Sequence, residues 1–79
     1  MPTVLRWNGF RFYFYSHEGT EPPHIHVDKA GNTAKFWLDP EIELAGDYGL
    51  GRRSVTTALR LIREHEDEIR AAWKKHFRR

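Results

Sequence analysis

Two stretches near the N-terminus alternate apolar and polar side chains with a period of two, which is the pattern of a β-strand. They cover residues 3–7 and 10–15 and flank Asn8-Gly9, the dipeptide that best accommodates the positive φ angles of a two-residue hairpin turn. The pattern predicts a β-hairpin with one apolar face. Its predicted core-facing residues are Leu5, Trp7, Phe10, Phe12 and Phe14, with Trp7 opposite Phe10 and Leu5 opposite Phe12, and its outward residues are Val4, Arg6, Arg11, Tyr13 and Tyr15.

A second pair of alternating stretches, residues 24–28 and 33–38, surrounds Ala30-Gly31. A hairpin with its tip at this dipeptide matches apolar residues with apolar residues, which supports that register. Residues 16–23 before it are expected to form a loop, and residues 41–44 after it are expected to add a short edge strand. The predicted core pairs are Val27–Ala34 and Ile25–Phe36, and the predicted outward pairs are His26–Lys35 and His24–Trp37.

The apolar period lengthens to three and four residues from Ser54 onward, which predicts an amphipathic α-helix with Ser54 as its N-cap. No proline interrupts this region, so we expect one long helix. Its apolar face would cover one side of the sheet and leave the other side uncovered. Oppositely charged residues four apart are expected to pair on its solvated side: Arg60–Glu64, Arg63–Asp67 and Glu66–Arg70.

The fold class predicted from these elements is α+β. Residues 1–79 are expected to form a single domain, in which an antiparallel sheet of about four strands is covered on one face by the long C-terminal helix. The chain has no cysteine, no signal peptide and no apolar run near the ~20 residues that cross a bilayer. These features favour a cytoplasmic protein without a membrane partner.

Charge is distributed unevenly along the chain. Residues 1–51 carry four Lys/Arg against seven Asp/Glu, whereas residues 52–79 carry nine against four. A basic C-terminal half can indicate a nucleic-acid or acidic-protein partner. Cations at the end of a helix are also favoured by the helix dipole without any partner, and we consider that interpretation the stronger one.

His24 and His26 are the strongest candidates for chemistry. Because they are two apart in a predicted strand, both imidazoles point to the same side and can approach one metal or one phosphate. The Pro22-Pro23 pair before them restricts the backbone, as a positioned acid, base or ligand requires. An isolated His-x-His pair is nevertheless more often structural than functional.

Several short motifs occur in order along nearly the whole chain. They are the run Glu18 to Val27, Ala34-Lys35-Phe36-Trp37-Leu38, Leu44-Ala45, Tyr48-Gly49-Leu50, and the ending Ala72-Trp73 with Phe77. In these motifs the sequence resembles the small bacterial family called domain of unknown function 4160. The resemblance implies a short stand-alone protein, often encoded beside a second small protein as in a toxin–antitoxin module, and it brings no established catalytic residue. Glu18, Glu21, His24, His26, Lys35 and Trp37 match the motif of the family, whereas His17 stands where relatives more often have Asn.

Three functions are compatible with the uncovered side of the predicted sheet. In the first, the protein binds or cleaves RNA: aromatic rings stack on bases, Arg and Lys neutralise phosphates, and His24 and His26 act as general base and general acid without a metal. The binding residues would be Arg6, Arg11, Tyr13, Tyr15, Lys35 and Trp37.

In the second, the protein is not an enzyme, and the same aromatic face docks a cognate small protein encoded nearby. In the third, a divalent metal such as zinc or nickel is bound by nitrogen and oxygen ligands. Those ligands would be His24, His26, Glu18, Glu21 and Asp28.

Overall fold

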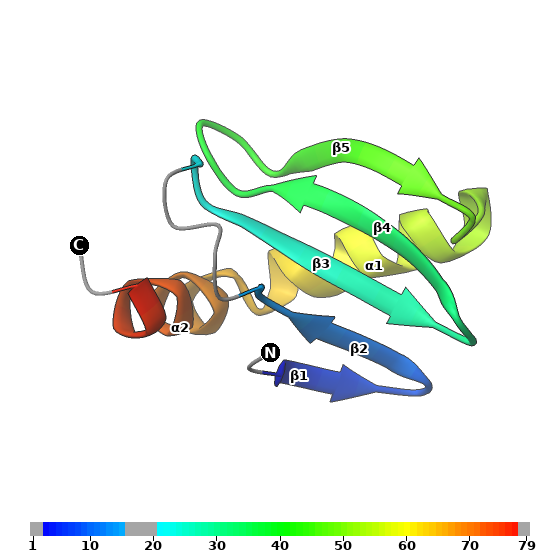
Figure 1. Cartoon of the computed structure of the whole chain (residues 1–79), viewed down its shortest axis with the longest axis horizontal. Helices are drawn as coiled ribbons and strands as arrows, with labels where there is room; N and C mark the ends of the chain where they lie inside the picture. Colours follow the sequence, from blue (N-terminus) through cyan, green and yellow to red (C-terminus); the bar gives the residue numbers. More distant parts are fainter. Residues whose placement is uncertain (1–2, 16–20, 78–79) are drawn as a thin grey trace.

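A computed structural model of the chain describes residues 3–15 and 21–77, in which five antiparallel strands form one sheet with two helices (Figure 1). The strand order β1-β2-β3-β4-β5 follows the chain, so each strand pairs with the strands before and after it. The predicted α+β class is confirmed, with five strands instead of about four and two helices instead of one. The elements are β1 Thr3–Trp7, β2 Phe10–Tyr13, β3 His24–Lys29, β4 Asn32–Trp37, β5 Glu43–Tyr48, α1 Arg52–Glu64 and α2 Glu66–Phe77.

Both predicted hairpins are confirmed, with the predicted register. Asn8 and Gly9 have φ values of 49° and 89°, and Ala30 and Gly31 have 51° and 83°, as two-residue turns with positive φ require. The apolar pairing fixes these registers, since a slip of one residue would move every core side chain to the wrong face. The observed pairs include Leu5–Phe12, Trp7–Phe10, His24–Trp37, Ile25–Phe36, His26–Lys35 and Val27–Ala34.

The edge strand predicted over residues 41–44 lies further along the chain, at β5. The stretch from Ala45 to Gly51, which follows the predicted strand, contains three glycines. Gly46 nevertheless lies within the strand, opposite Lys35. A Cβ at Gly46 would lie 2.5 Å from the hydroxyl oxygen of Tyr48, so the glycine makes room for the Tyr48 ring above the strand.

The long helix is divided into α1 and α2 at His65. A straight helix over residues 52–77 would be about 39 Å long at 1.5 Å per residue, longer than the largest dimension of the molecule, 33 Å. Polar residues His65 and Glu66 occupy the positions where the apolar stripe would continue after Ile62. The pairs Arg60–Glu64 and Glu66–Arg70 are observed, at 3.1 and 2.8 Å, whereas Arg63 and Asp67 lie on opposite sides of the break.

The prediction of Ser54 as the N-cap is wrong, because α1 begins two residues earlier with Gly51 in the N-cap position. The carboxylate of Asp47 accepts hydrogen bonds from the backbone N–H groups of Leu50 at 2.8 Å, Gly49 at 3.2 Å and Gly51 at 3.3 Å. Asp47 at the end of β5 therefore organises the turn into the helix.

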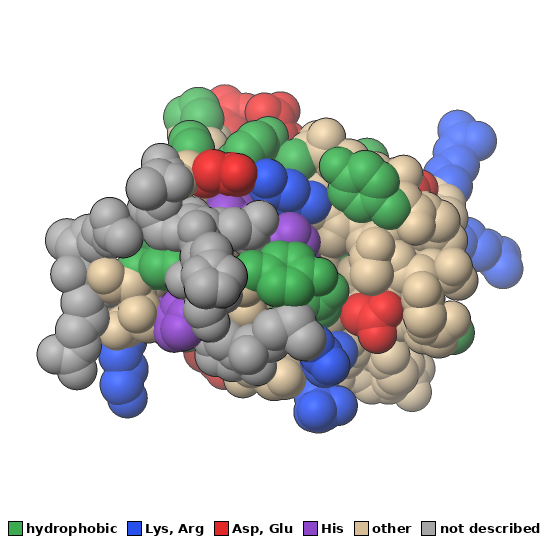
Figure 2. Space-filling view, viewed as in Figure 1, with side chains coloured by type: hydrophobic (Ala, Val, Ile, Leu, Met, Phe, Trp, Pro, Cys, Tyr) green, Lys and Arg blue, Asp and Glu red, His purple; other side chains and the backbone are tan. Residues whose placement is uncertain are grey.

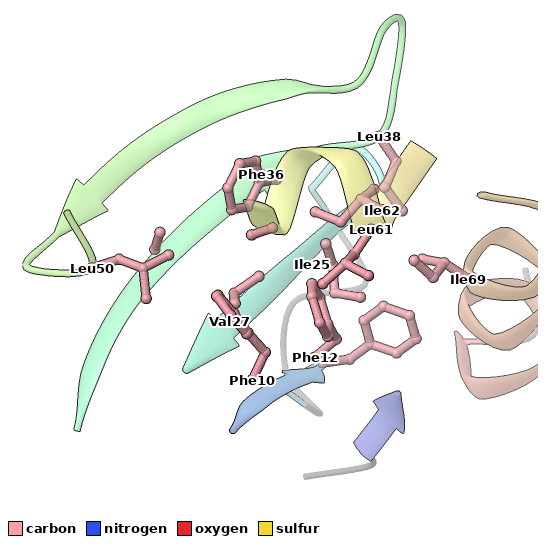
Figure 3. Close-up of a cluster of buried hydrophobic side chains, with 13 residues drawn as sticks. Phe10, Phe12, Ile25, Val27, Phe36, Leu38, Leu50, Leu61, Ile62 and Ile69 are labelled. Atoms are coloured by element: carbon pink, nitrogen blue, oxygen red, sulfur yellow. The ribbon is translucent and has the colours of Figure 1, made fainter. Parts of the chain in front are cut away.

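The core lies between α1 and one face of the sheet (Figure 3). Phe12, Ile25 and Phe36 of the sheet are fully buried, and Ile62 of α1 faces them. Figure 1 shows α1 crossing behind the sheet, whereas α2 extends beyond the end where β3 begins. Helix α1 thus covers one face of the sheet, and α2 reaches the other face where β3 begins.

Two residues of the first hairpin depart from their predicted environments. Trp7, expected in the core, is 40% exposed at the edge of the sheet, beside Arg60, whose guanidinium lies 5.7 Å from the ring centroid. Val4, expected to face outward, packs against the core, because the register shifts between Thr3 and Leu5 and a bulge of this kind re-aims the extra side chain.

Helix α2 is tied to the turn between β4 and β5 by Arg70. Its guanidinium donates to Asp39 at 2.6 Å, to Glu66 at 2.8 Å and to the backbone carbonyl of Leu38. These acceptors raise the pKa of Arg70, first through the hydrogen bond to Glu66 and then through that to Asp39. None of the helices in the described part of the chain is both long enough and apolar enough to span a membrane.

Candidate functional site

We call the sheet face opposite α1 the open face; Figure 2 views the molecule from this side. It is built by every second residue of the strands, because side chains alternate between the two faces of a sheet. The pairing places its residues in three rows across the strands: Arg6–Arg11–Asp28–Thr33, then Tyr13–His26–Lys35–Gly46, then His24–Trp37–Glu43. Five of the six predicted binding residues lie in these rows, and the sixth, Tyr15, follows β2 and contacts Tyr13 and His26 on the same side.

An aromatic cluster occupies the centre of the open face. The ring of His26 stacks on Tyr13 with centroids 5.6 Å apart, and Tyr15 meets His26 edge-on at 4.5 Å. The guanidinium of Arg11 also lies over the Tyr13 ring, 4.3 Å from its centroid. Tyr13 is only 3% exposed although it faces away from the core, whereas Tyr15 is 40% exposed. The cluster thus has a buried base and an accessible rim.

The buried position of Tyr13 changes its acidity. Burial raises the pKa of Tyr13 well above its ordinary value, and a side-chain hydrogen bond with Tyr15 raises it further. The phenol is therefore neutral throughout the physiological range. The uncharged Tyr13 ring supports His26 by stacking against it.

His24 is buried, although it was predicted to lie on an uncovered surface. It has no exposed surface, and Trp37 and Trp73 flank its ring at centroid distances of 5.8 and 5.1 Å. Its Nδ1 lies 2.9 Å from the carbonyl oxygen of Pro22. A carbonyl oxygen can only accept, so Nδ1 donates in this contact.

The rings of His24 and His26 lie 5.2 Å apart, so the two histidines are neighbours as predicted. They differ in accessibility, since His26 is only partly buried. A substrate atom at the surface can reach His26 and not His24 in this arrangement.

Lys35 is held beside the histidines by two partners. Its ammonium group donates to the Glu21 carboxylate at 2.7 Å and lies 4.5 Å from the centroid of Trp37. The same carboxylate oxygen is 3.8 Å from Nδ1 of His24. Lys35 is thus neutralised by Glu21, and its side chain is mostly buried at 17% exposure.

The described open face has balanced charges. Three cationic groups, Arg6, Arg11 and Lys35, are accompanied by three carboxylates, Glu21, Asp28 and Glu43. Figure 2 shows blue, red, green and purple side chains intermixed on this side. The two helices carry seven Lys/Arg against four Asp/Glu, and they lie behind and beyond the sheet.

Sequence reasoning missed two residues of this surface. Tyr48, which lies beyond the edge strand predicted over residues 41–44, is on the open face because its ring covers Gly46, which stands opposite Lys35. At 65% exposure it is the most exposed large apolar side chain in the described chain. Trp73, named only in the family resemblance, covers His24 from α2. The period-two pattern through Gly46 and Tyr48 could have predicted the position of Tyr48. The position of Trp73 depends on the helix break at His65.

The predicted metal ligands are not assembled into a site within residues 3–15 and 21–77. No group of three or more His, Asp or Glu side chains there could hold a metal ion. Glu18 and His17 lie outside the described residues. Asp28 belongs to the row of Arg11 and Thr33, beside the row of His26.

A family model described as Domain of unknown function (DUF4160) matches residues 9–74. That range includes His24, His26, Lys35, Trp37 and Trp73. No curated protein and no solved structure is detectably similar to the chain.

Proposed function

Because the chain belongs to the family described as Domain of unknown function (DUF4160), which brings no activity, we propose a function from the open face: it binds a small protein partner. The supporting observation is the combination of exposed aromatic rings with balanced charge. Tyr15 and Tyr48 are 40% and 65% exposed, and Trp37 is partly exposed between them. Tyr and Trp are the residue types that most often anchor protein interfaces.

Charge complementarity indicates the chemistry of the partner. Arg6 and Arg11 are directly opposite each other on neighbouring strands, and like charges in such positions destabilise a sheet. An acidic group on the partner would offset that repulsion. The proposed partner is a cognate small protein with an apolar centre that covers Tyr15, Trp37 and Tyr48, and a carboxylate that meets the arginine pair.

RNA binding is the second candidate, supported by the same exposed rings next to Arg6 and Arg11. Base stacking on Tyr15 or Tyr48 would be tolerant of sequence. Balanced charge makes this candidate the weaker one, since nucleic-acid affinity depends chiefly on cations that neutralise phosphates. Cleavage by both histidines is less well supported still, because His24 has no exposed surface.

Co-expression with the product of the neighbouring gene tests the proposal. We expect a complex whose mass by light scattering equals the sum of both chains. Tyr15→Ala should weaken it by at least about tenfold, as an interface anchor does. Trp7→Ala is the matched control, because Trp7 has the same 40% exposure on the opposite side of the sheet.

Separate elution of the two proteins at micromolar concentration, or equal losses in Tyr15→Ala and Trp7→Ala, would contradict partner docking. A titration with single-stranded RNA distinguishes the second candidate. Under partner docking we expect no salt-dependent binding. RNA binding with a log–log salt slope that falls by about one unit in Arg6→Ala would favour the RNA candidate instead.

A further inference from the structure

A half-open groove lies at the end of the sheet, between α2 and the turn that follows β4. Its volume is about 480 Å³, and it is lined mainly by Pro23, Trp73 and Phe77, with Asp39, Arg70, Ala71 and Lys74 completing its wall. Volumes of this order, apolar walls and a few polar groups are typical of small-ligand sites. The proposed partner surface does not account for this groove.

The aromatic wall of the groove is rigid. Trp73 and Phe77 lie one helical turn apart with ring centroids at 4.1 Å, and Trp73 is also in contact with Phe14 at 5.2 Å and with His24 at 5.1 Å. These neighbours fix the indole from the side of the protein. A flat ring entering the groove would therefore meet preorganised apolar surface, which lowers the entropic cost of binding.

The charges around the groove favour an anion. Arg70 and Asp39 neutralise each other at 2.6 Å, and Glu66 also binds Arg70. Lys74 is exposed and makes no ion pair with any residue in the described part of the chain. Glu66 does not line the groove, so the charged residues of its wall are Asp39, Arg70 and Lys74. They carry one net positive charge, at Lys74 next to the aromatic wall.

We propose that this groove binds a small aromatic carboxylate. The ring lies against Trp73 and the side chain of Pro23, and the carboxylate pairs with the Lys74 ammonium. The interaction combines apolar burial, which supplies most of the affinity, with a partly exposed ion pair that selects the anion.

Phenylacetate is a suitable probe, and phenylacetamide is its neutral counterpart. In an NMR titration of the full chain we expect the indole N–H signal of Trp73 to shift and saturate, with a Kd of about 1 mM for a ligand of this size. Lys74→Gln should raise the Kd about threefold, whereas Lys75→Gln, its matched neighbour outside the groove, should leave it unchanged. Phenylacetamide should bind as weakly to the wild-type chain as phenylacetate binds to Lys74→Gln.

Ala71→Leu provides a steric test, because Ala71 is exposed in the groove wall and leucine is a good helix former. This variant should fold normally and lose the saturable shift. The proposal is overturned if phenylacetate gives no saturable Trp73 shift up to about 20 mM, if phenylacetamide binds equally well, or if Ala71→Leu retains binding. The titration needs no protein partner, so its outcome is independent of docking on the open face.

Discussion

His24 of β3 and Trp73 of α2 lie with their ring centroids 5.1 Å apart, and the tryptophan covers the histidine where the sheet ends. A residue on the face opposite α1 is thereby buried by the second helix. The contact explains why the first of two equivalent strand histidines has no exposed surface while the second remains accessible.

Removal of the Trp73 side chain should therefore destabilise the protein. We expect Trp73→Ala to lower the free energy of unfolding by about 3 kcal/mol, the low end for a buried aromatic because Trp73 is only partly buried. Trp7→Ala, which removes the same side chain from a more exposed edge position, should cost less than half as much. Urea unfolding of both variants gives the comparison, and equal losses would show that Trp73 does not cover a buried cluster.

Alkaline pH should reveal the burial of Tyr13. Its folded-state pKa is raised above the ordinary value of 10.0 by burial and by the hydrogen bond with Tyr15. The resulting stabilisation is fully present below pH 10 and is lost as the pH rises above it, because the unfolded chain then releases a proton that the folded chain retains. The slope from this one group is about 1.4 kcal/mol per pH unit.

Tyr13→Phe should remove that part of the alkaline slope and, at neutral pH, cost about 1 kcal/mol for the lost hydrogen bond. Tyr48→Phe is the control, because Tyr48 is 65% exposed. Unfolding curves at pH 8, 10 and 11 (chosen to bracket about 10, the unperturbed tyrosine pKa) would decide. An unchanged slope in Tyr13→Phe would contradict the raised pKa.

Local patterns were sufficient to predict the two hairpins and their registers. Asn8-Gly9 specifies the first turn, and the apolar pairs such as Ile25–Phe36 specify the second. Both signals are short-range. The open face followed from them, since strand alternation alone determines which side chains share a face.

The remaining features depend on contacts between distant segments, or lack the residues that usually mark the end of a helix or strand. The helix break at His65 has no glycine or proline to mark it, and Gly46 lies inside a strand, where it leaves space for Tyr48. Burial of His24 requires Trp73, whose position depends on that break. Sequence patterns therefore predicted which residues share the open face, but not which of them are accessible to solvent.

Arg70 should be more important for stability than its partial exposure indicates. It donates to Glu66, Asp39 and the Leu38 carbonyl, so Arg70→Gln should lower the free energy of unfolding by about 1–2 kcal/mol. Arg70→Lys should not restore the lost stability, since an ammonium lacks the planar fork that serves several acceptors.

Hydrogen exchange of α2 should accelerate in both variants. Arg63→Gln, an exposed change near the break, is the control; a comparable acceleration there would contradict a specific role for Arg70.

The start of α1 differs from the sequence prediction, because Gly51 is the N-cap and Asp47 organises the turn before it. Asp47 accepts from the N–H groups of Gly49, Leu50 and Gly51, whereas Ser54 lies inside the helix. Asp47→Ala should therefore cost about 1–2 kcal/mol, because three backbone N–H groups of the turn before α1 lose their acceptor. Ser54→Ala should change stability by less than about 0.5 kcal/mol, because it also improves helix propensity.

Asp47→Asn, which retains an accepting oxygen, should recover most of the loss. Thermal unfolding of the three variants measures these differences, and a larger loss in Ser54→Ala than in Asp47→Ala would restore serine as the cap.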